Sequence, residues 1–219
     1  LLSNVEHMDQ IDQQMNQHKK ELDKIAAELT KKRKGVASKL EKNIQSELKE
    51  LMMKNSVFEV NFSETSLREF GKDDVQFMIS TNQGELPKPL EKIISGGEAS
   101  RIMLALKKII AEVDQVGTLV FDEIDANIGG RLGKVIGEKL REIAKNSQIL
   151  IVTHLPQIAS LASTHFKVSK HVHGSRTTTN CRKLKEPEKV TELAEMMSGN
   201  QTTQISRKHA KELLEEAKH

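Results

Sequence analysis

The stretch Ile94–Arg101, which reads ISGGEASR, decides the predicted fold because it marks a loop that turns into a helix. Ser95 and Glu98 have the spacing of a capping box, and the two glycines between them let backbone N–H groups approach a ligand closely. A helix start with free amides and a positive dipole end suits a phosphate. The stretch therefore predicts an anion-binding loop at the beginning of a helix.

A second marker is the stretch Thr118–Glu123, TLVFDE, an apolar strand that ends in two acidic residues. It places the carboxylates of Asp122 and Glu123 at the carboxyl edge of a sheet, where open α/β folds bind ligands. Thr153 and His154 follow the next apolar strand. Taken alone, a Ser-x-x-Glu pattern is usually only a helix start, and an apolar run ending in Asp-Glu is often an ordinary buried strand. The order of the three features is the more specific signal.

This order resembles the carboxyl-terminal half of an ABC-type ATPase head, with signature motif, Walker B motif, D-loop and switch histidine in succession. Three segments are similar in sequence to bacterial DNA repair proteins of the SMC-like ATPase family: Pro89–Glu98, Arg101–Lys107 and Val152–Ala159. The similarity runs from about Leu22 to the end of the chain. It implies an α/β fold: the carboxyl-terminal lobe of an ABC-type, P-loop NTPase-like head at 55–219, preceded by a long coiled-coil helix at 1–54.

The composition limits the classes of protein to which the chain can belong. The 219 residues are 30% charged and 37% apolar, which is lean for one globule and fits a long solvated helix. The net charge is only +3, and aromatic residues make up 3% with no Trp or Tyr, so stacking platforms for single-stranded nucleic acid are hard to build. The single cysteine, Cys181, excludes an internal disulfide and fits a reducing cytoplasm. No apolar run approaches membrane-spanning length, so no membrane partner is expected.

The first 54 residues have a helical pattern without proline. Apolar positions alternate three and four steps apart, with two polar exceptions, along a heptad seam: Met8, Ile11, Met15, His18, Leu22, Ile25, Leu29, Lys32 and Val36. The steps then become four at Leu40, Ile44 and Leu48, as for a helix that leaves a coil to pack on a globular body, and Gly35 is a candidate bend. Such a seam needs a partner helix. Two partners stay open: a second copy of the chain, or an antiparallel arm from a missing amino-terminal half, which the resemblance favours.

The remaining sequence predicts alternating strands and helices and, from that alternation, a largely parallel sheet. A polar connection is expected at Ser63–Asp74, between two short strands. The predicted elements are strands at Val57–Phe62, Val75–Ile79, Thr118–Phe121 and Gln148–Val152, a hairpin at Thr164–Lys170 and Arg176–Leu184, and helices at Gly96–Val113, Gly130–Lys145, Glu188–Met197 and Ile205–Lys218. Pro156 predicts one more short helix.

The resemblance implies specific roles in ATP hydrolysis. Asp122 would help to hold Mg²⁺, through water, because Mg²⁺ prefers hard oxygen ligands and keeps part of its hydration shell. Glu123 would orient and deprotonate the attacking water, and His154 would contact the γ-phosphate. A histidine at a strand end is otherwise more often structural. The implied cofactors are ATP and Mg²⁺.

The resemblance also implies a site shared between two heads. The signature residues Ser95, Gly96, Gly97 and Glu98 would face ATP held by a second head of a homodimer. Asp125, with the turn 126–129, resembles a D-loop that touches the opposite head.

The sequence contains no Gly-x-x-x-x-Gly-Lys-Ser/Thr P-loop. The run Gly129–Lys134, GGRLGK, has the wrong spacing and is interpreted as a helix start. The P-loop is therefore expected in the amino-terminal half of the same protein, so that this chain carries half of an active site.

Two further groups of residues have weaker interpretations. His171, His173 and Cys181 could imitate a metal cluster, although a polar hairpin is the favoured interpretation. The basic run Lys31, Lys32, Arg33 and Lys34 could contact DNA phosphates or form only a solvated face of the coil.

The predicted function is that of an SMC-like ATPase in DNA double-strand break repair and recombination, in the cytoplasm and associated with the nucleoid. Two alternatives remain: the nucleotide-binding domain of an ABC transporter, and a non-enzymatic coiled-coil scaffold with a degenerate head.

Overall fold

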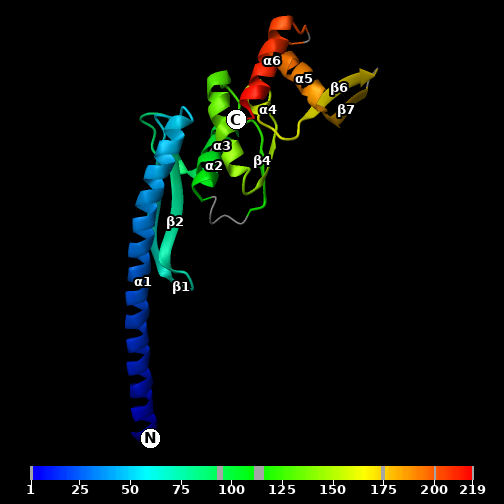
Figure 1. Cartoon of the computed structure of the whole chain (residues 1–219). Coiled ribbons are helices and arrows are strands. Elements are labelled where there is room, and N and C mark those ends of the chain that lie inside the picture. Colours follow the sequence, from blue (N-terminus) through cyan, green and yellow to red (C-terminus); the bar gives the residue numbers. More distant parts are fainter. Residues whose placement is uncertain (1, 93–95, 111–115, 174–175, 200, 219) are drawn as a thin grey trace. The chain divides into compact units, whose positions relative to one another are not determined.

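A computed structural model describes residues 2–92, 96–110, 116–173, 176–199 and 201–218 of the chain (Figure 1). The fold mixes helices and strands and begins with one long helix, as predicted. In chain order the elements are α1 Leu2–Glu50, β1 Val57–Arg68, β2 Gly71–Ser80, β3 Lys88–Pro89, the 3₁₀ helix η1 Leu90–Lys92, α2 Gly96–Ile110, β4 Thr118–Phe121, α3 Gly130–Ile143, β5 Gln148–Ile151, α4 Pro156–Ala159, β6 Phe166–His173, β7 Arg176–Lys183, α5 Glu186–Ser198 and α6 Gln204–Glu216.

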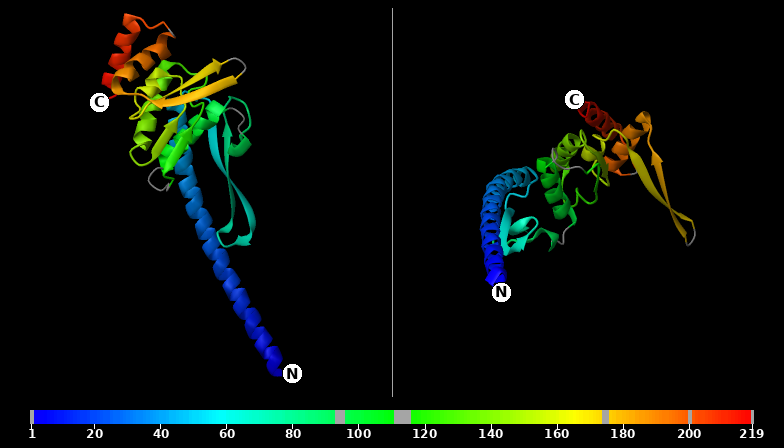
Figure 2. Two further views of the ribbon diagram at one scale, coloured as in Figure 1. Left: turned by 90° about the vertical axis from the view of Figure 1, so that its right-hand side faces the viewer. Right: turned by 90° about the horizontal axis from the view of Figure 1, so that it is seen from below.

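The chain divides into two compact units: residues 1–46 with 55–92, and residues 47–54 with 93–219. In the first unit, β1 and β2 form a long antiparallel hairpin along α1, and β3 adds to its β2 side (Figure 1, Figure 2). Phe58 lies opposite Ile79 in this hairpin, and both side chains are buried. Partners in an antiparallel pair share a face, so the hairpin has one apolar face.

Polar side chains of α1 contact the hairpin. Asp73 accepts a hydrogen bond from Thr30 Oγ1 at 2.7 Å and pairs with Arg33 Nη1 at 3.0 Å. The hydrogen bond from Thr30, followed by that from the Arg33 guanidinium, holds the pKa of Asp73 below its ordinary value. Farther along α1, Glu41 accepts a hydrogen bond from the backbone N–H of Val60 at 2.8 Å. These contacts satisfy polar groups of the hairpin that would otherwise need water.

The predicted polar connection at Ser63–Asp74 is wrong, because β1 continues to Arg68 and β2 begins at Gly71. Gly71, at φ 93°, follows the tight turn that joins the two strands. The strand was not predicted this far because Asp73, a charged residue, lies on the face of the hairpin that contacts α1. Its charge is paired there with Arg33 of α1.

The predicted seam on α1 is mostly uncovered. Met15, Leu22 and Ile25 are exposed by 62%, 49% and 62%, so the apolar stripe lies open along the amino-terminal part of the helix. Ile44 and Leu48 are fully buried, in agreement with the predicted change of pattern after Val36. The helix runs through Gly35 without interruption.

The second unit contains a parallel pair of strands, β4 and β5, with Thr118 opposite Gln148 and Phe121 opposite Ile151. The predicted largely parallel sheet is wrong in extent, because within the described part of the chain parallel pairing is confined to these two strands. The hairpins β1–β2 and β6–β7 are antiparallel because short connections join consecutive strands. The predicted bounds of β4 are confirmed, and those of β5 agree to within one residue.

The last residues of α1, from Glu47 on, belong to the second unit, and their charged side chains contact α2 and α3 of the same unit. Lys139 of α3 is 4% exposed and pairs with Glu47 and with Glu50, the latter at 2.6 Å. Lys108 of α2 pairs with the same Glu47 at 3.0 Å and with Glu142 of α3 at 3.2 Å. The ammonium group of Lys139 holds the pKa of Glu50 below its ordinary value. A buried lysine is stable only with such partners.

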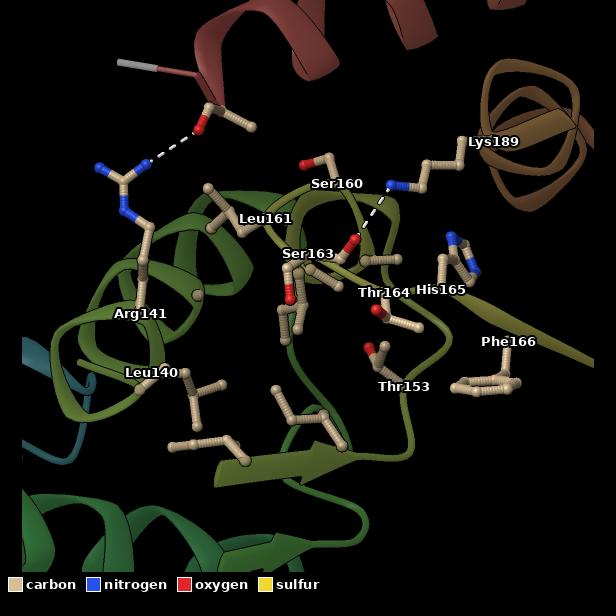
Figure 3. Close-up of a pocket in the computed structure, with 18 of the residues that line it drawn as sticks. Leu140, Arg141, Thr153, Ser160, Leu161, Ser163, Thr164, His165, Phe166 and Lys189 are labelled. Atoms are coloured by element: carbon tan, nitrogen blue, oxygen red, sulfur yellow. Dashed lines mark hydrogen bonds between the residues drawn. The ribbon is translucent and has the colours of Figure 1, made fainter. Parts of the chain in front are cut away.

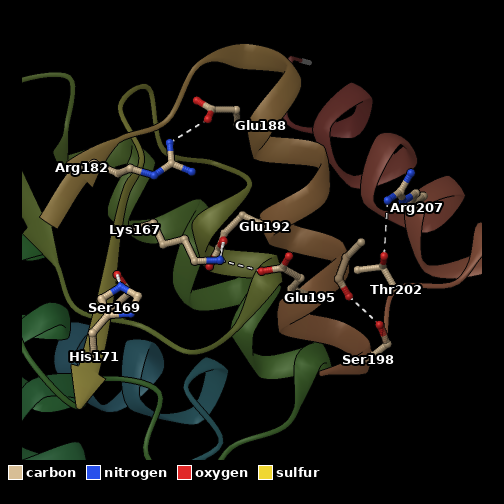
Figure 4. A network of polar contacts seen from close by, with 11 residues as sticks. Lys167, Ser169, His171, Arg182, Glu188, Glu192, Glu195, Ser198, Thr202 and Arg207 are labelled. Carbon is tan, nitrogen blue, oxygen red and sulfur yellow. Dashed lines mark hydrogen bonds and ion pairs between the residues drawn. The ribbon is translucent and has the colours of Figure 1, made fainter. Parts of the chain in front are cut away.

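The carboxyl-terminal part of the second unit packs a hairpin and two helices. Buried Leu193, Ala194 and Ala210 form a small apolar core with Ala159 of α4. Lys167 of β6 pairs with Glu192 and Glu195 of α5, and these carboxylates raise the pKa of Lys167 (Figure 4). The hairpin and the two closing helices are confirmed with small shifts in their bounds.

Among the helices that the structure describes, none is both long and apolar enough to cross a membrane.

Candidate functional site

The ends of β4 and β5 bring the two predicted catalytic segments together. The backbone N–H of Val152 donates to the carbonyl oxygen of Phe121 at 3.0 Å, so the two strands are still paired where they end. Asp122 and Glu123 follow β4 directly, and both are exposed. Thr153 and His154 follow the neighbouring strand, and the His154 side chain is 68% exposed. The predicted juxtaposition of acids and histidine at one sheet edge is therefore present.

A tight turn follows β4 and separates outward from inward side chains. The N–H of Ala126 donates to the carbonyl oxygen of Glu123 at 3.0 Å, which closes a turn over Glu123–Ala126. The two central residues, Ile124 and Asp125, are 0% and 3% exposed. Glu123 has φ 56°, a left-handed conformation that is strained for a side chain of this kind. The turn thus leaves the predicted base exposed and buries the next carboxylate.

Asp125 contacts the loop that carries His154. One of its oxygens, Oδ2, accepts hydrogen bonds from Thr153 Oγ1 at 2.5 Å, from the His154 N–H at 2.8 Å and from the Leu155 N–H at 3.3 Å. The same oxygen lies 3.1 Å from Nδ1 of the His154 ring. A carboxylate that accepts several N–H and O–H groups fixes the backbone that supplies them. Asp125 therefore contacts the histidine loop of its own chain.

The start of α2 packs against the same turn. Ser100 Oγ donates to the carbonyl oxygen of Asp122 at 2.8 Å, and Arg101 Nη1 donates to that of Ala126 at 3.3 Å. A Cβ added at Gly97 would lie 3.0 Å from the Ala126 Cβ, and one added at Gly96 would overlap the Glu123 carboxylate. A side chain at Gly97 would also meet the Glu123 carbonyl oxygen at 3.1 Å, so this glycine permits the close approach of the two segments, whereas at Gly96 only the end of the flexible Glu123 side chain would have to move. Burial lowers the pKa of Arg101.

The structure leaves some predicted site residues unplaced or engaged elsewhere. Ser95 lies outside the described residues, and Glu98 is half-buried near the start of α2. In the basic run, Arg33 pairs with Asp73, and Lys34 Nζ lies 5.8 Å from the centre of the Phe62 ring. Lys31 and Lys32 are exposed. Lys34 is also exposed, so three lysines of this run remain open to solvent, whereas Arg33 is half-buried and paired.

The proposed imitation of a metal cluster on the β6–β7 hairpin has no geometric support. Cys181 lies opposite Val168, whereas His171 lies opposite Thr178, three residues farther along β6. Side chains alternate across a strand, so Cys181 and His171 lie on opposite faces of the hairpin. In the described ranges, no group of three or more His, Cys, Asp or Glu side chains could hold a metal ion.

A broad pocket of the second unit lies beside β5 and α4 (Figure 3). Its lining includes Thr153, His165 and Lys189, and Lys189 Nζ is engaged by the carbonyl oxygen of Ser163 at 3.3 Å and by Glu186 at 2.7 Å. Asp122 and Glu123 do not line it. The pocket therefore adjoins the histidine loop without containing the acidic pair.

Three residues in this arrangement received no role from the sequence. Ser100 and Arg101 lie in the stretch that predicts the helix start, and Thr153 directly precedes His154. Their hydrogen bonds to Asp122, Ala126 and Asp125 depend on which segments meet in three dimensions. All three residues lie next to predicted motifs in the sequence, which is a sign of a role at the site. That position does not predict which residues they hydrogen-bond to.

Comparison with known proteins relates the chain to one group of sequences. It is 44% identical over 220 residues to DNA repair protein RecN of Halalkalibacterium halodurans, which covers 98% of this chain and 39% of that protein. It is 40% identical over 238 residues to DNA repair protein RecN of Bacillus subtilis, covering 97% of this chain and 41% of that protein. The chain thus spans about two fifths of the length of these relatives. No family model matches the chain.

Solved structures give partial similarities. The Smc head domain with a coiled coil and joint from Pyrococcus yayanosii has a TM-score of 0.49 at 19% identity, over 82% of this chain and 29% of that one. The Smc head domain with an extended coiled coil from Pyrococcus furiosus, bound to the C-terminal domain of ScpA, has a TM-score of 0.47 at 19% identity, over 73% of this chain and 38% of that one. The family assignment does not depend on these two similarities. From the sequence relatives, the chain belongs to the family of proteins named DNA repair protein RecN.

Proposed function

We propose that this chain is the carboxyl-terminal lobe of an SMC-like, ABC-type ATPase head that acts in DNA double-strand break repair and recombination. The observation that carries the proposal is the meeting of three segments around one turn: the acids after β4, the His154 loop after β5 and the glycine-led start of α2. The names of the RecN relatives supply the link to DNA repair. Residues 1–54 would form the returning coiled-coil arm and residues 55–219 the lobe.

In this proposal each side chain at the strand ends has one task. Asp122 is exposed and offers hard oxygen atoms, which suits an indirect contact to Mg²⁺ through water. Mg²⁺, bound together with ATP, would neutralise charge on the phosphates. Glu123 is also exposed and would accept the proton of the attacking water, while His154 would donate a hydrogen bond toward the γ-phosphate. No other acidic or histidine side chains of the described regions complete a metal site, so the remaining ligands would be water and groups of another lobe.

The P-loop would come from the amino-terminal half of the same protein. The sequence contains none, and the β4–β5 pair leaves Val120, Leu150 and Val152 exposed by 68%, 49% and 63%. An open apolar face of this kind is typical of a surface that another part of a protein covers. A P-loop lobe over this pair would supply the lysine and hydroxyl that the sequence lacks.

Further partners follow from the same proposal. The open apolar stripe of α1 would pair with an antiparallel arm from the amino-terminal half. A second head would place its own Ser95, Gly96, Gly97 and Glu98 against the ATP held here, with the turn after Asp125 near that boundary. Lys31, Lys32 and Lys34 are exposed and would offer charge to DNA phosphates, whereas Arg33 is already paired with Asp73. Work on DNA in a bacterial cell would place the protein in the cytoplasm, at the nucleoid.

The experiment that tests the proposal compares Glu123→Gln with the unchanged residue in the complete protein that carries the P-loop. The variant keeps the size and hydrogen bonding of the side chain but removes the proton acceptor. It should bind ATP with unchanged affinity and hydrolyse it slower by about two orders of magnitude or more. Glu138→Gln, which removes an exposed carboxylate on α3, is the matched control and should keep full activity. Equal hydrolysis rates in Glu123→Gln and the unchanged protein would remove Glu123 as the base. An unchanged protein that hydrolyses no ATP would favour a non-enzymatic scaffold.

A further inference from the structure

We infer that Asp125 is a positioning residue for His154 of its own chain, and that it does not reach the opposite head. The inference rests on the proposed function and assigns Asp125 a different task from the D-loop contact expected from sequence.

Asp125 is too deeply buried to contact a second protomer. Its side chain is 4% exposed, and it occupies a central position of the turn that begins at Glu123. The other central residue, Ile124, is 0% exposed, so the turn directs both side chains inward. A carboxylate held in this way has no free surface for a second protomer. Asn127, exposed and at φ 59°, is the outward residue of the same segment.

The Asp125 carboxylate holds both the backbone and the ring of His154. Oδ2 accepts from the Thr153 hydroxyl and from the backbone N–H groups of His154 and Leu155, at 2.5, 2.8 and 3.3 Å. Thr153 Oγ1 also accepts from the Leu155 N–H at 3.0 Å, so hydroxyl and carboxylate fix the loop from one side. The His154 ring lies against the same oxygen through Nδ1, at 3.1 Å, while most of the ring is exposed. A ring supported at Nδ1 presents Nε2 outward, because the two nitrogens lie on different edges of the imidazole.

The third step is the shared position of Asp125 and Glu123 on one short turn. The turn also receives hydrogen bonds from Ser100 and Arg101 at the start of α2. Asp125 thus sets the distance between the base after β4 and the histidine after β5. Removing its carboxylate releases the His154 loop while leaving Glu123 in place.

The first arm of the test uses the 219-residue chain and needs no catalysis. Amide hydrogen exchange at His154 and Leu155 should become at least about tenfold faster in Asp125→Ala than in the unchanged chain. Asp125→Asn keeps one carbonyl acceptor and should give an intermediate rate, and the Glu138→Gln control should give no change. Equal exchange at both amides in all variants, with the fold retained by circular dichroism, overturns the inference.

The second arm uses mixed dimers of the complete protein. Glu123→Gln mixed with Asp125→Ala leaves both composite sites defective if Asp125 serves its own chain, so activity should stay at the level of the parents. Activity that returns on mixing shows that Asp125 acts across the dimer, and it overturns the inference. KM for ATP in Asp125→Ala should stay within about twofold while kcat falls at least about tenfold, with partial recovery in Asp125→Asn.

Mixing Glu123→Gln with Ser95→Arg is the control for shared sites and should restore activity. If it does not, the shared site of the proposed function fails. The exchange result then decides alone whether Asp125 holds His154, so the two failures are distinguishable.

Discussion

Replacing Glu123 by glycine and by alanine separates backbone strain from chemistry at the turn after β4. Glu123 has φ 56°, which costs a residue with a Cβ about 1–2 kcal/mol. Glycine adopts this conformation freely but loses about 0.5–1 kcal/mol more conformational entropy on folding. The glycine variant should therefore be more stable than the alanine variant by about 0.5–1 kcal/mol. For a chain of this size that difference corresponds to a shift in Tm of about 1–4 °C.

Thermal unfolding of the two variants, followed by circular dichroism, is the assay. The matched pair is Glu138→Gly and Glu138→Ala, since Glu138 is an exposed residue inside α3. There the order should reverse, with the glycine variant less stable by about 1 kcal/mol. In the complete protein both Glu123 variants lack the carboxylate, so both should hydrolyse ATP slower than the unchanged protein by about two orders of magnitude or more. An alanine variant at 123 that is as stable as the glycine variant would refute the reasoning from strain.

Two further predictions concern the first unit. Leu22→Asp combined with Ile25→Asp should prevent pairing of α1 with the opposing arm while the chain stays folded, because both side chains are exposed and a coiled-coil partner would bury the introduced carboxylates. Co-purification of the two halves measures this, and unchanged pairing would move the contact away from α1. Asp73→Asn should destabilise the chain at neutral pH but not in acid. Its folded pKa is lowered by Thr30 and Arg33, so its contribution is present above the unfolded pKa of about 4 and is lost as the pH falls through the folded value. Urea unfolding of both proteins at several pH values tests this, and a difference that persists in strong acid would contradict it.

The structure also changes which residues are useful probes of the coil. Leu29 belongs to the predicted seam, yet it lies against the turn of the β1–β2 hairpin, where a Cβ added at Gly71 would be 3.1 Å from its Cδ2. A charge at Leu29 would disturb this contact as well as a coiled coil. Leu22 and Ile25 are both exposed, so a charge at either position would test the coiled coil without disturbing a contact of this kind.

Local pattern was sufficient to predict the elements that carry the site. The apolar run 118–121 has acids directly after it, and the strand ends at Phe121 as expected. Gly129–Gly130 was interpreted as a helix start, and α3 begins at Gly130. These features depend on residues close in sequence, so neither needed information about distant contacts.

The roles that depend on distant contacts could not be predicted in the same way. The resemblance to a D-loop implies that Asp125 touches the opposite head, but its carboxylate accepts a hydrogen bond from Thr153, 28 residues farther along the chain. The inner face of the β1–β2 hairpin includes Asp73, whose partner Arg33 lies 40 residues earlier. A single sequence carries no signal that these pairs meet, and polar residues on a buried face were therefore interpreted as connection.

The most direct test of the central claim measures ATP binding and hydrolysis by this chain alone and after it is combined with the half that carries the P-loop. Isothermal titration with Mg²⁺ should show only very weak ATP binding by the chain alone, and hydrolysis should be absent. Combined with the other half, it should hydrolyse ATP, and Glu123→Gln in this chain should slow that hydrolysis by about two orders of magnitude or more. Micromolar ATP binding by the chain alone, or hydrolysis without the other half, would contradict the claim that it supplies only part of the site.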